Sequence, residues 1–163
     1  MNRSYLFLPA DSERKMKKAA GAGADALVLD LEDSVAADAK PAARELCRAY
    51  IEDQDNCWVR INALNTDDAV LDLEAVIGGA PAGVVLPKAC GPDDVRRLAA
   101  ILDDLESSNG LETGQTGILP ICTEIPAAVF TLGSYAGSSS RLAAMTWGAD
   151  DLSAVMGASA NRD

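Results

Sequence analysis

The sequence contains no histidine. This absence excludes Ser-His and Cys-His nucleophilic catalysis, and it excludes metal sites built on imidazole ligands. Any chemistry must therefore use carboxylates, arginine, lysine, backbone dipoles or a bound ion. Such a chain suits Mg²⁺, which prefers oxygen ligands, and is poorly suited to Zn²⁺.

Long apolar runs are also missing, and none approaches the ~20 residues that a membrane-spanning helix requires. The N-terminal stretch MNRSYLFLPADSERK has an apolar part too short for a signal peptide and lacks a small-residue cleavage site. We therefore expect a soluble, cytoplasmic protein with no membrane partner.

Paired cysteines are absent as well. Cys47, Cys57, Cys90 and Cys122 form no CxxC motif, which leaves a zinc knuckle without support. Scattered thiols of this kind are typical of reduced, partly buried residues. We expect these four to have a structural role.

Basic residues are few, with 14 Lys and Arg against 25 Asp and Glu and a net charge of −11. Nucleic-acid binding requires a basic face, so nucleic acid is not an expected partner. An acidic enzyme can still bind an anionic substrate, provided that a local cation receives it.

What the sequence does contain is a regular order of apolar segments. The chain has 163 residues, 48% of them hydrophobic, which is enough for one domain with one core. Six segments are predicted to be strands: residues 3–9, 26–32, 58–62, 83–88, 117–124 and 141–149. The apolar runs in these segments are continuous rather than alternating, which is typical of parallel strands buried on both faces.

Helical patterns fill the intervals between these segments. The first opens at an N-cap candidate, Asp11 or Ser12, and the fourth carries Pro92 and two aspartates in its first turn. The alternation of strand and helix predicts βαβ units with right-handed crossovers. The five predicted helices cover residues 11–24, 36–54, 67–77, 91–108 and 125–135.

Two parallel architectures compete. A doubly wound sheet usually carries a glycine-rich phosphate turn after a strand, but residues 21–25 (GAGAD) close a helix and precede a strand. A (βα)₈ barrel instead builds its active site at the carboxyl ends of its strands. Polar residues cluster at those ends here: Asp30, Glu32, Asp33, Arg60, Asn62, Lys88, Glu124, Asp150 and Asp151.

We therefore predict an α/β protein of the (βα)₈ TIM-barrel type. Six strands do not close such a barrel, which usually needs ~250 residues. Residues 1–163 are accordingly expected to form a partial TIM-barrel catalytic domain with about six βα units, without the C-terminal strands or a lid segment.

Several motifs, in this order, resemble one family. They are residues 3–35, VRIN (59–62), GVVLPK (83–88), TEIPAAV (123–129) and WGADDLSAVMG (147–157). Together they closely resemble the citrate lyase β-subunit-like proteins, the CoA-ester lyase branch of the HpcH/HpaI aldolase superfamily. The resemblance implies a (βα)₈ barrel that uses Mg²⁺ to cleave or form β-hydroxyacyl-CoA thioesters of the citryl-CoA or malyl-CoA type. It also implies acyl-CoA and oxoacid substrates and a homo-oligomer.

The resemblance implies two metal ligands, Glu124 after the fifth strand and Asp151 after the sixth. The family motif G-x-x-D-L falls on residues 148–152, and Asp150 stands where the family often has Glu or Ala. The alternative for Asp151 is a purely structural role as the N-cap of the following helix.

Catalytic roles fall on Arg60, Glu32 and Asp33. Arg60 would offer its planar guanidinium to a carboxylate or to a developing enolate oxygen, or else pair with Asp30, Glu32 or Asp33 inside the barrel. Glu32 and Asp33 match the family's acidic pair and are expected to hold metal-bound waters and to orient Arg60 or Lys88. The alternative is that one of them caps the next helix. Lys88 would neutralise the carboxylates or touch substrate. Asp30 is expected on the alternate face of its strand, with a structural role.

Cofactor binding is the least specific part of the resemblance. In relatives, residues near the first helix bind CoA phosphates, which points to Arg14 and Lys18; a solvated helix face is the alternative. Residues 124–128 (EIPAA) differ from the E-T-A-R-G that many relatives carry, so a neighbouring arginine is absent. The general acid/base is expected in a C-terminal segment outside this sequence. Two other readings stay open, an aldolase acting on a free 2-oxoacid without CoA and a non-catalytic subunit.

Overall fold

Five parallel strands form a single sheet in the computed structural model, which describes residues 2–148 and 150–159. Within these residues the spatial order of the strands follows the chain: β1 (Tyr5–Pro9), β2 (Ala26–Asp30), β3 (Cys57–Arg60), β4 (Gly83–Leu86) and β5 (Gly117–Pro120). Sequential parallel order is the arrangement of a (βα)₈ barrel, because each helix returns the chain to the next position around the sheet. The predicted fold class is therefore confirmed.

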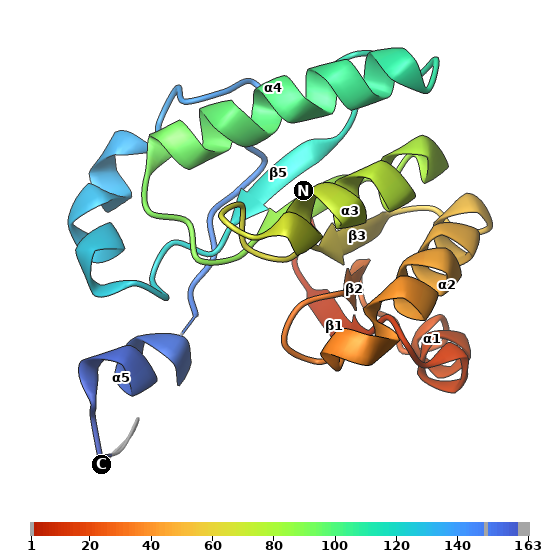
Figure 1. Ribbon diagram of the computed structural model, residues 1–163, viewed down its shortest axis with the longest axis horizontal. Helices are drawn as coiled ribbons and strands as arrows, with labels where there is room; N and C mark the ends of the chain where they lie inside the picture. Colours follow the sequence, from red (N-terminus) through yellow and green to blue (C-terminus); the bar gives the residue numbers. More distant parts are fainter. Residues whose placement is uncertain (1, 149, 160–163) are drawn as a thin grey trace.

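Helices α1 to α4 connect the strands and follow one another around one side of the sheet (Figure 1). They are α1 (Glu13–Ala19), α2 (Lys40–Glu52), α3 (Asp67–Val76) and α4 (Pro92–Ser108). Short 3₁₀ turns, η1 (Ala37–Ala39) and η2 (Ile77–Gly79), precede α2 and follow α3. Beyond β5 come a longer 3₁₀ segment, η3 (Pro126–Ser134), and α5 (Asp150–Met156), which projects away from the sheet in Figure 1.

The predicted sixth strand, residues 141–149, is not a regular strand in the part that the structure describes. Two isolated parallel bridges, Ile118 to Leu142 and Ile121 to Thr146, hold it beside β5. The three residue steps from Ile118 to Ile121 face four steps from Leu142 to Thr146, so the pairing register slips by one residue between the two bridges. The segment occupies the expected place without the expected regularity.

The predicted fifth helix, residues 125–135, forms the 3₁₀ segment η3 instead of an α-helix. Two hydroxyl groups bond to carbonyls three residues back: Thr131 Oγ1 donates to Ala128 O at 2.8 Å, and Ser134 Oγ donates to Thr131 O at 2.6 Å. Such local bonds compete with the α-helical pattern and suit the tighter turn.

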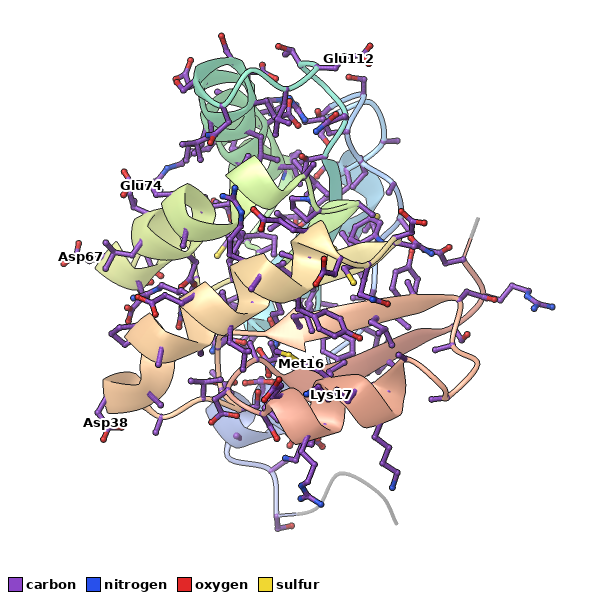
Figure 2. The ribbon with its side chains drawn as sticks, turned by 90° about the vertical axis from the view of Figure 1, so that its right-hand side faces the viewer. Met16, Lys17, Asp38, Asp67, Glu74 and Glu112 are labelled. Carbon is purple, nitrogen blue, oxygen red and sulfur yellow. The ribbon has the colours of Figure 1, made fainter. Side chains whose placement is uncertain are left out.

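The main core lies between the sheet and its helices. Met16 of α1, Leu29 of β2, Leu73 of α3 and Leu98 of α4 are each no more than 1% exposed. Figure 2 shows Met16 inside while its neighbour Lys17 points outward. Acidic side chains such as Asp67 and Glu112 lie at the periphery of the same view, so much of the negative charge is solvated. All four cysteines are free thiols, and three of them are buried, as predicted.

The opposite face of the sheet, here called the inner face because it would line a closed barrel, is organised around Trp58. Its ring packs edge-on against Tyr5, with ring centroids 5.6 Å apart. The ring also covers Gly83 and Gly117, its neighbours on β4 and β5, where a Cβ atom would collide with it or crowd it. Small residues on two strands thus make room for one large ring.

A buried ion pair closes the amino end of β5. Glu106 of α4 accepts hydrogen bonds from Arg141 Nη1 at 2.9 Å and Nη2 at 2.6 Å, and from the Thr116 and Gly114 backbone N–H groups at 2.8 and 2.7 Å. Burial opposes the ionised form, but these donors lower the pKa of Glu106 from 4.5 to about 2. The pair ties the irregular sixth segment to α4, at the end of β5 opposite Glu124.

None of the helices in the described parts of the chain is long and apolar enough to cross a membrane.

Gly83→Ala is predicted to destabilise the chain by about 1–3 kcal/mol, because the added methyl overlaps the Trp58 ring. Urea unfolding followed by tryptophan fluorescence measures the change. Gly133→Ala is the matched control, since no heavy atom lies within 4 Å of its added Cβ. Equal losses of stability in the two variants would show that the Trp58 ring does not pack closely over Gly83.

Glu106→Gln is predicted to lower the free energy of unfolding at neutral pH by about 3 kcal/mol, because it leaves the buried Arg141 cation with only the half-exposed Asp103 carboxylate. The folded-state pKa of Glu106 is about 2 and its ordinary value is 4.5, so its stabilisation is present above the ordinary value and is lost as pH falls through the folded one. The difference between wild type and variant should therefore shrink as pH falls below about 4.5. A difference that stays constant down to about pH 3 would refute this account.

Candidate functional site

The carboxyl end of the sheet places Asp30 and Arg60 side by side. The parallel register pairs these two residues directly, so both side chains lie on the inner face. Arg60 Nε donates to Asp30 Oδ1 at 2.7 Å and Nη2 donates to Oδ2 at 2.6 Å, a bidentate pair. The expectation that Asp30 faces the alternate side was therefore wrong. Its structural role is confirmed, because it holds the guanidinium in place.

This pair sets the charge of both residues. Burial opposes the charged form of each, but their mutual hydrogen bonds outweigh it and lower the pKa of Asp30 while raising the pKa of Arg60. The guanidinium also stacks over Phe7, with Cζ 5.6 Å from the ring centroid. Arg60 is thus fixed and charged at the mouth of the sheet.

Glu32 lies just beyond β2 and meets two cations. Its Oε1 accepts a hydrogen bond from Lys88 Nζ at 2.5 Å, and its Oε2 lies 3.0 Å from Arg60 Nη1. The second contact has the distance of an ion pair but not the angle of a hydrogen bond, so Oε2 is a buried oxygen without a hydrogen-bond donor. Burial dominates here and raises the pKa of Glu32, although Lys88 and Arg60 oppose it. Asp33 is more exposed, at 58% of its side chain, and lies 3.7 Å from Lys88 Nζ.

Lys88 joins the second strand to the fifth. It adopts a left-handed backbone conformation with φ 53°, which is unusual for a residue with a side chain. That conformation lets its backbone N–H donate to Glu124 Oε2 while its ammonium reaches Glu32. Burial opposes its charge, but the contact with Glu32 raises the pKa of Lys88 on balance. One residue therefore holds carboxylates from two sides of the site.

Glu124, which follows β5, is 2% exposed. Burial is the main cause that raises its pKa to about 7; the nearby Glu32 and Asp151 carboxylates add to the rise, and the Lys88 N–H opposes it. Gly148 packs against it, since a Cβ there would lie 2.6 Å from Glu124 Cγ. Thr123 fixes Gly148 by accepting from its N–H at 2.9 Å and donating to its carbonyl at 3.1 Å. The Gly148 backbone is thus part of the wall around the carboxylate.

Asp151 completes the acidic group. Helix α5 begins at Asp150, so Asp151 is a first-turn residue rather than the cap of the helix. Its side chain is partly exposed, and its charge raises the pKa of both Glu124 and Lys88. The structure thus brings Asp151 into the electrostatic neighbourhood of Glu124. Asp30, Glu32, Asp33, Glu124 and Asp151, with Arg60 and Lys88, are called the acidic cluster from here on.

The two residues predicted to bind CoA lie elsewhere. Arg14 and Lys18 are exposed on α1, and no contact joins either to the acidic cluster among the described residues. Lys18 and Lys15 border an open depression of about 660 Å³ whose floor includes Phe7 and Leu8 of β1. Phe7 thus lies both in this depression and under the Arg60 guanidinium. The pairing register places Phe7, Val28 and Trp58 in one row across the sheet, and the sequence patterns did not single out Phe7.

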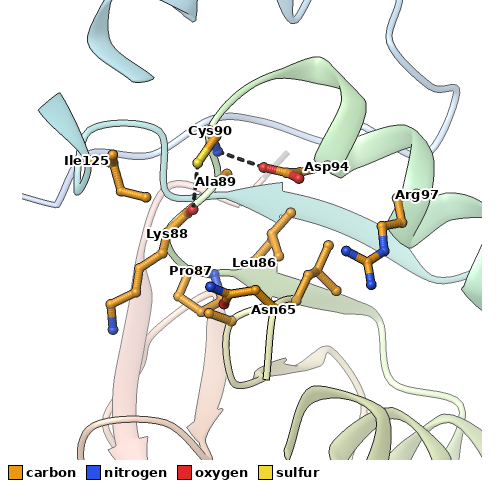
Figure 3. A pocket seen from close by; sticks show the side chains of 11 residues that line it. Asn65, Leu86, Pro87, Lys88, Ala89, Cys90, Asp94, Arg97 and Ile125 are labelled. Carbon is orange, nitrogen blue, oxygen red and sulfur yellow. Dashed lines mark hydrogen bonds between the residues drawn. The ribbon is translucent and has the colours of Figure 1, made fainter. Parts of the chain in front are cut away.

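A cavity of about 190 Å³ lies on the other side of Lys88, between the end of β4 and α4 (Figure 3). Lys88 and Arg97 stand on opposite sides of it in this view, with Asn65 between them. Cys90 N–H donates to Asp94 Oδ2 at 2.7 Å and fixes the turn into α4. Of the acidic cluster, Lys88 lines this cavity, whereas Glu32, Glu124 and Asp151 do not.

A parallel sheet in sequential strand order, with charged residues gathered at its carboxyl ends, is the arrangement of a (βα)-barrel protein. The family model "HpcH/HpaI aldolase/citrate lyase" matches residues 3–163, and the chain belongs to this family.

Similar proteins agree with this placement. A citrate lyase subunit beta-like protein from Mycobacterium tuberculosis is 40% identical over 161 residues, covering 97% of this chain and 51% of its own. A (3S)-malyl-CoA thioesterase from Cereibacter sphaeroides is 35% identical over 159 residues, covering 95% and 51%. The crystal structure of CitE from Mycobacterium tuberculosis in complex with magnesium, acetoacetate and coenzyme A superposes with a TM-score of 0.77 at 35% identity, covering 100% of this chain and 55% of that one. The chain spans about half the length of the curated relatives it matches.

Asp30→Asn is predicted to lower the free energy of unfolding by about 3 kcal/mol, because it breaks a buried bidentate pair and leaves Arg60 with Glu32 alone. Chemical denaturation measures the loss. Glu52→Gln is the matched control, since it removes an exposed i,i+4 pair with Arg48 that contributes about 0.5 kcal/mol or less. A loss no larger than that of the control would show that the Asp30–Arg60 pair does not hold the site.

Proposed function

We propose that the chain is part of a Mg²⁺-dependent carbon–carbon lyase that cleaves or forms β-hydroxyacyl-CoA thioesters of the citryl-CoA or malyl-CoA type. The products of cleavage would be an oxoacid and an acyl-CoA. Family membership supports the reaction class, and the names of the relatives support the substrate class. The observation that carries the proposal is the buried Glu124 carboxylate, held near Asp151 and Glu32 at the strand ends.

The donor set fits Mg²⁺. Glu124 and Asp151 supply hard carboxylate oxygens, and the cluster holds more carboxylates than cations, so a dication would offset the excess charge. No group of three or more ligating side chains converges on one point in the described residues. Mg²⁺ suits such a site, since it is usually held by one or two carboxylates and keeps water and substrate as its other ligands. We propose Glu124 and Asp151 as its protein ligands.

A bound Mg²⁺ would act as a Lewis acid that orients the oxoacid half of the substrate and draws charge from it. In cleavage, a base that we assign to no residue of this chain takes the β-hydroxyl proton. The oxygen then forms the carbonyl of the oxoacid, and the electron pair of the breaking carbon–carbon bond passes to the thioester as an enolate. Arg60 retains N–H groups beyond the two that Asp30 accepts. These groups are positioned to stabilise an enolate oxygen or a substrate carboxylate.

The other residues of the cluster would keep this machinery in place. Glu32 orients Arg60 and Lys88 through its two oxygens, and Asp33 contributes charge at the solvent side. Lys88 limits the repulsion between the carboxylates while its backbone fixes Glu124. Protonation of the enolate needs an acid that we do not assign to any residue of this chain.

For the CoA moiety we propose contacts on α1, as the resemblance to the family implies. Lys18 is exposed on this helix, and its ammonium group would meet a CoA phosphate. Arg14, one turn earlier on α1, is the second phosphate contact that we propose. A homo-oligomer and a cytoplasmic location stay predictions from sequence.

A thioesterase is a second candidate, favoured by the similarity to the (3S)-malyl-CoA thioesterase. The two reactions differ in the bond that breaks, the carbon–carbon bond in a lyase and the C–S bond in a thioesterase. Product analysis with malyl-CoA separates them, because a lyase releases glyoxylate and acetyl-CoA while a thioesterase releases malate and free CoA.

Glu124→Gln and Asp151→Asn are each predicted to lower Mg²⁺ affinity by at least tenfold and to remove Mg²⁺-dependent cleavage of the CoA ester. Titration calorimetry measures the affinity, and circular dichroism checks that the fold is retained. Glu112→Gln, on the exposed surface in Figure 2, is the charge-matched control and should behave as wild type. Unchanged Mg²⁺ affinity in both site variants would show that the ligands are misassigned.

A further inference from the structure

A second buried polar group lies behind the acidic cluster, between the ends of β2 and β3 and the helices α2 and α3. It consists of Lys40 and Arg44 of α2, Asn62 after β3 and Asp72 of α3, each no more than 8% exposed. We call it the Lys40 network. Of its members, the sequence patterns single out Asn62 alone, and the proposed reaction uses none of them.

Lys40 holds the backbone on which Glu32 is mounted. Its Nζ donates to Leu31 O at 2.7 Å, to Glu32 O at 3.2 Å and to Asn62 Oδ1 at 2.8 Å. These contacts use all three protons of the ammonium group. Asn62 Nδ2 donates to the same Leu31 carbonyl at 3.1 Å, so two side chains grip one peptide group.

Asp72 anchors the other side of the network. Its Oδ2 accepts from Asn62 N at 2.8 Å and from Asn62 Nδ2 at 2.7 Å, while Arg44 Nε donates to Oδ1 at 2.7 Å. The Arg44 cation compensates a carboxylate that is fully buried. Helices α2 and α3 are thereby tied to the carboxyl ends of two neighbouring strands.

Lys40 is the member that packing alone does not explain. It forms no ion pair with any carboxylate in the described residues, and its three acceptors are all neutral oxygens. Burying an unpaired ammonium is costly, and an apolar side chain at this position would avoid that cost. What the ammonium provides is a fixed position for two consecutive carbonyl groups.

Those carbonyls belong to the segment that carries Glu32. From the other side, Leu31 N–H donates to Arg60 O at 2.9 Å and Glu32 N–H donates to Asp30 Oδ1 at 2.9 Å. The peptide is therefore clamped between the acidic cluster and the Lys40 network. A shift of this backbone would move Glu32 relative to both Lys88 and Arg60, which its side chain meets at 2.5 and 3.0 Å.

We propose that Lys40 is a positioning residue for the acidic cluster, holding the carboxyl end of β2 so that Glu32 keeps Lys88 and Arg60 in register with Glu124. The part of this proposal that concerns metal affinity rests on the proposed function. The part that concerns the backbone does not, and it has its own measurement.

The test compares Lys40→Met, which keeps an unbranched chain and removes the three donors, with Glu106→Gln, which weakens the fold at the opposite end of β5. Amide hydrogen exchange without metal reads the backbone directly. We expect exchange at Leu31 and Glu32 to become at least about tenfold faster in Lys40→Met relative to its change in global stability, and to follow global stability alone in Glu106→Gln. If Lys40→Met does not fold, Lys40→Gln replaces it in the same comparison. The neutral amide of Gln has fewer N–H donors than the ammonium group of Lys and therefore cannot make all three contacts.

Mg²⁺ titration is the second readout. We expect Lys40→Met to weaken Mg²⁺ binding by about 10- to 100-fold, the usual effect of losing a group that orients metal ligands, and Glu106→Gln to leave it unchanged. Unchanged exchange at Leu31 and Glu32, or the same local increase in both variants, would overturn the proposal whatever the metal does. Faster exchange with unaltered Mg²⁺ affinity would overturn the link to the metal site. If the wild-type chain binds no Mg²⁺, the proposed function fails, and the exchange result still decides whether Lys40 holds the end of β2.

Discussion

Charge compensation at the carboxyl ends of the strands is the constraint on which the site depends. Asp30, Glu32 and Glu124 are each at most 5% exposed, so their charges need partners inside the protein. Arg60 is shared by Asp30 and Glu32, and Lys88 takes the other oxygen of Glu32. Glu124 receives only the Lys88 backbone N–H among its described hydrogen bonds, and its pKa rises to about 7. It is the carboxylate with the least compensation, and therefore the one at which a cation would add most.

Three further groups of contacts stabilise the fold around this edge of the sheet. Gly83 and Gly117 let Trp58 fill the inner face, and the Glu106–Arg141 pair closes the amino end of β5. The Lys40 network supports the carboxyl edge from the helix side. Contacts at both ends of the strands thus stabilise the fold, whereas the residues that shape the site lie at the carboxyl ends.

The sequence patterns predicted the order of strands and helices well, because continuous apolar runs and helical periodicity are local signals. They also predicted that Glu32, Arg60, Lys88 and Glu124 would meet, since parallel strands bring their carboxyl ends to one edge. They failed where the outcome depends on tertiary contacts. Asp30 was assigned to the wrong face, although the two-residue period of a strand places it on the same side as Glu32. The sixth strand is interrupted by a slip in its pairing register with β5. Residues 141–149 alone do not indicate that slip, because it depends on the neighbouring strand.

The backbone conformation of Lys88 and the burial of Lys40 had no signal in the apolar patterns or motifs of the sequence. The left-handed backbone of Lys88 accompanies contacts with two distant segments, and nothing in the motif LPK indicates it. Lys40 lies at the start of a helix, where a lysine is ordinarily solvated, and only the packed structure shows it buried against Leu31 and Glu32. The assignments of Arg14 and Lys18 to CoA, and of Glu124 and Asp151 to a metal, stay predictions.

The central claim is that Glu124 and Asp151 share one divalent cation. A crystal structure of the protein grown with Mg²⁺ and an oxoacid measures this most directly. The account predicts one ion with an oxygen of each residue at about 2.1 Å and the oxoacid completing its coordination near Arg60. An ion bound elsewhere, or two carboxylates too far apart to reach the same ion, would contradict it.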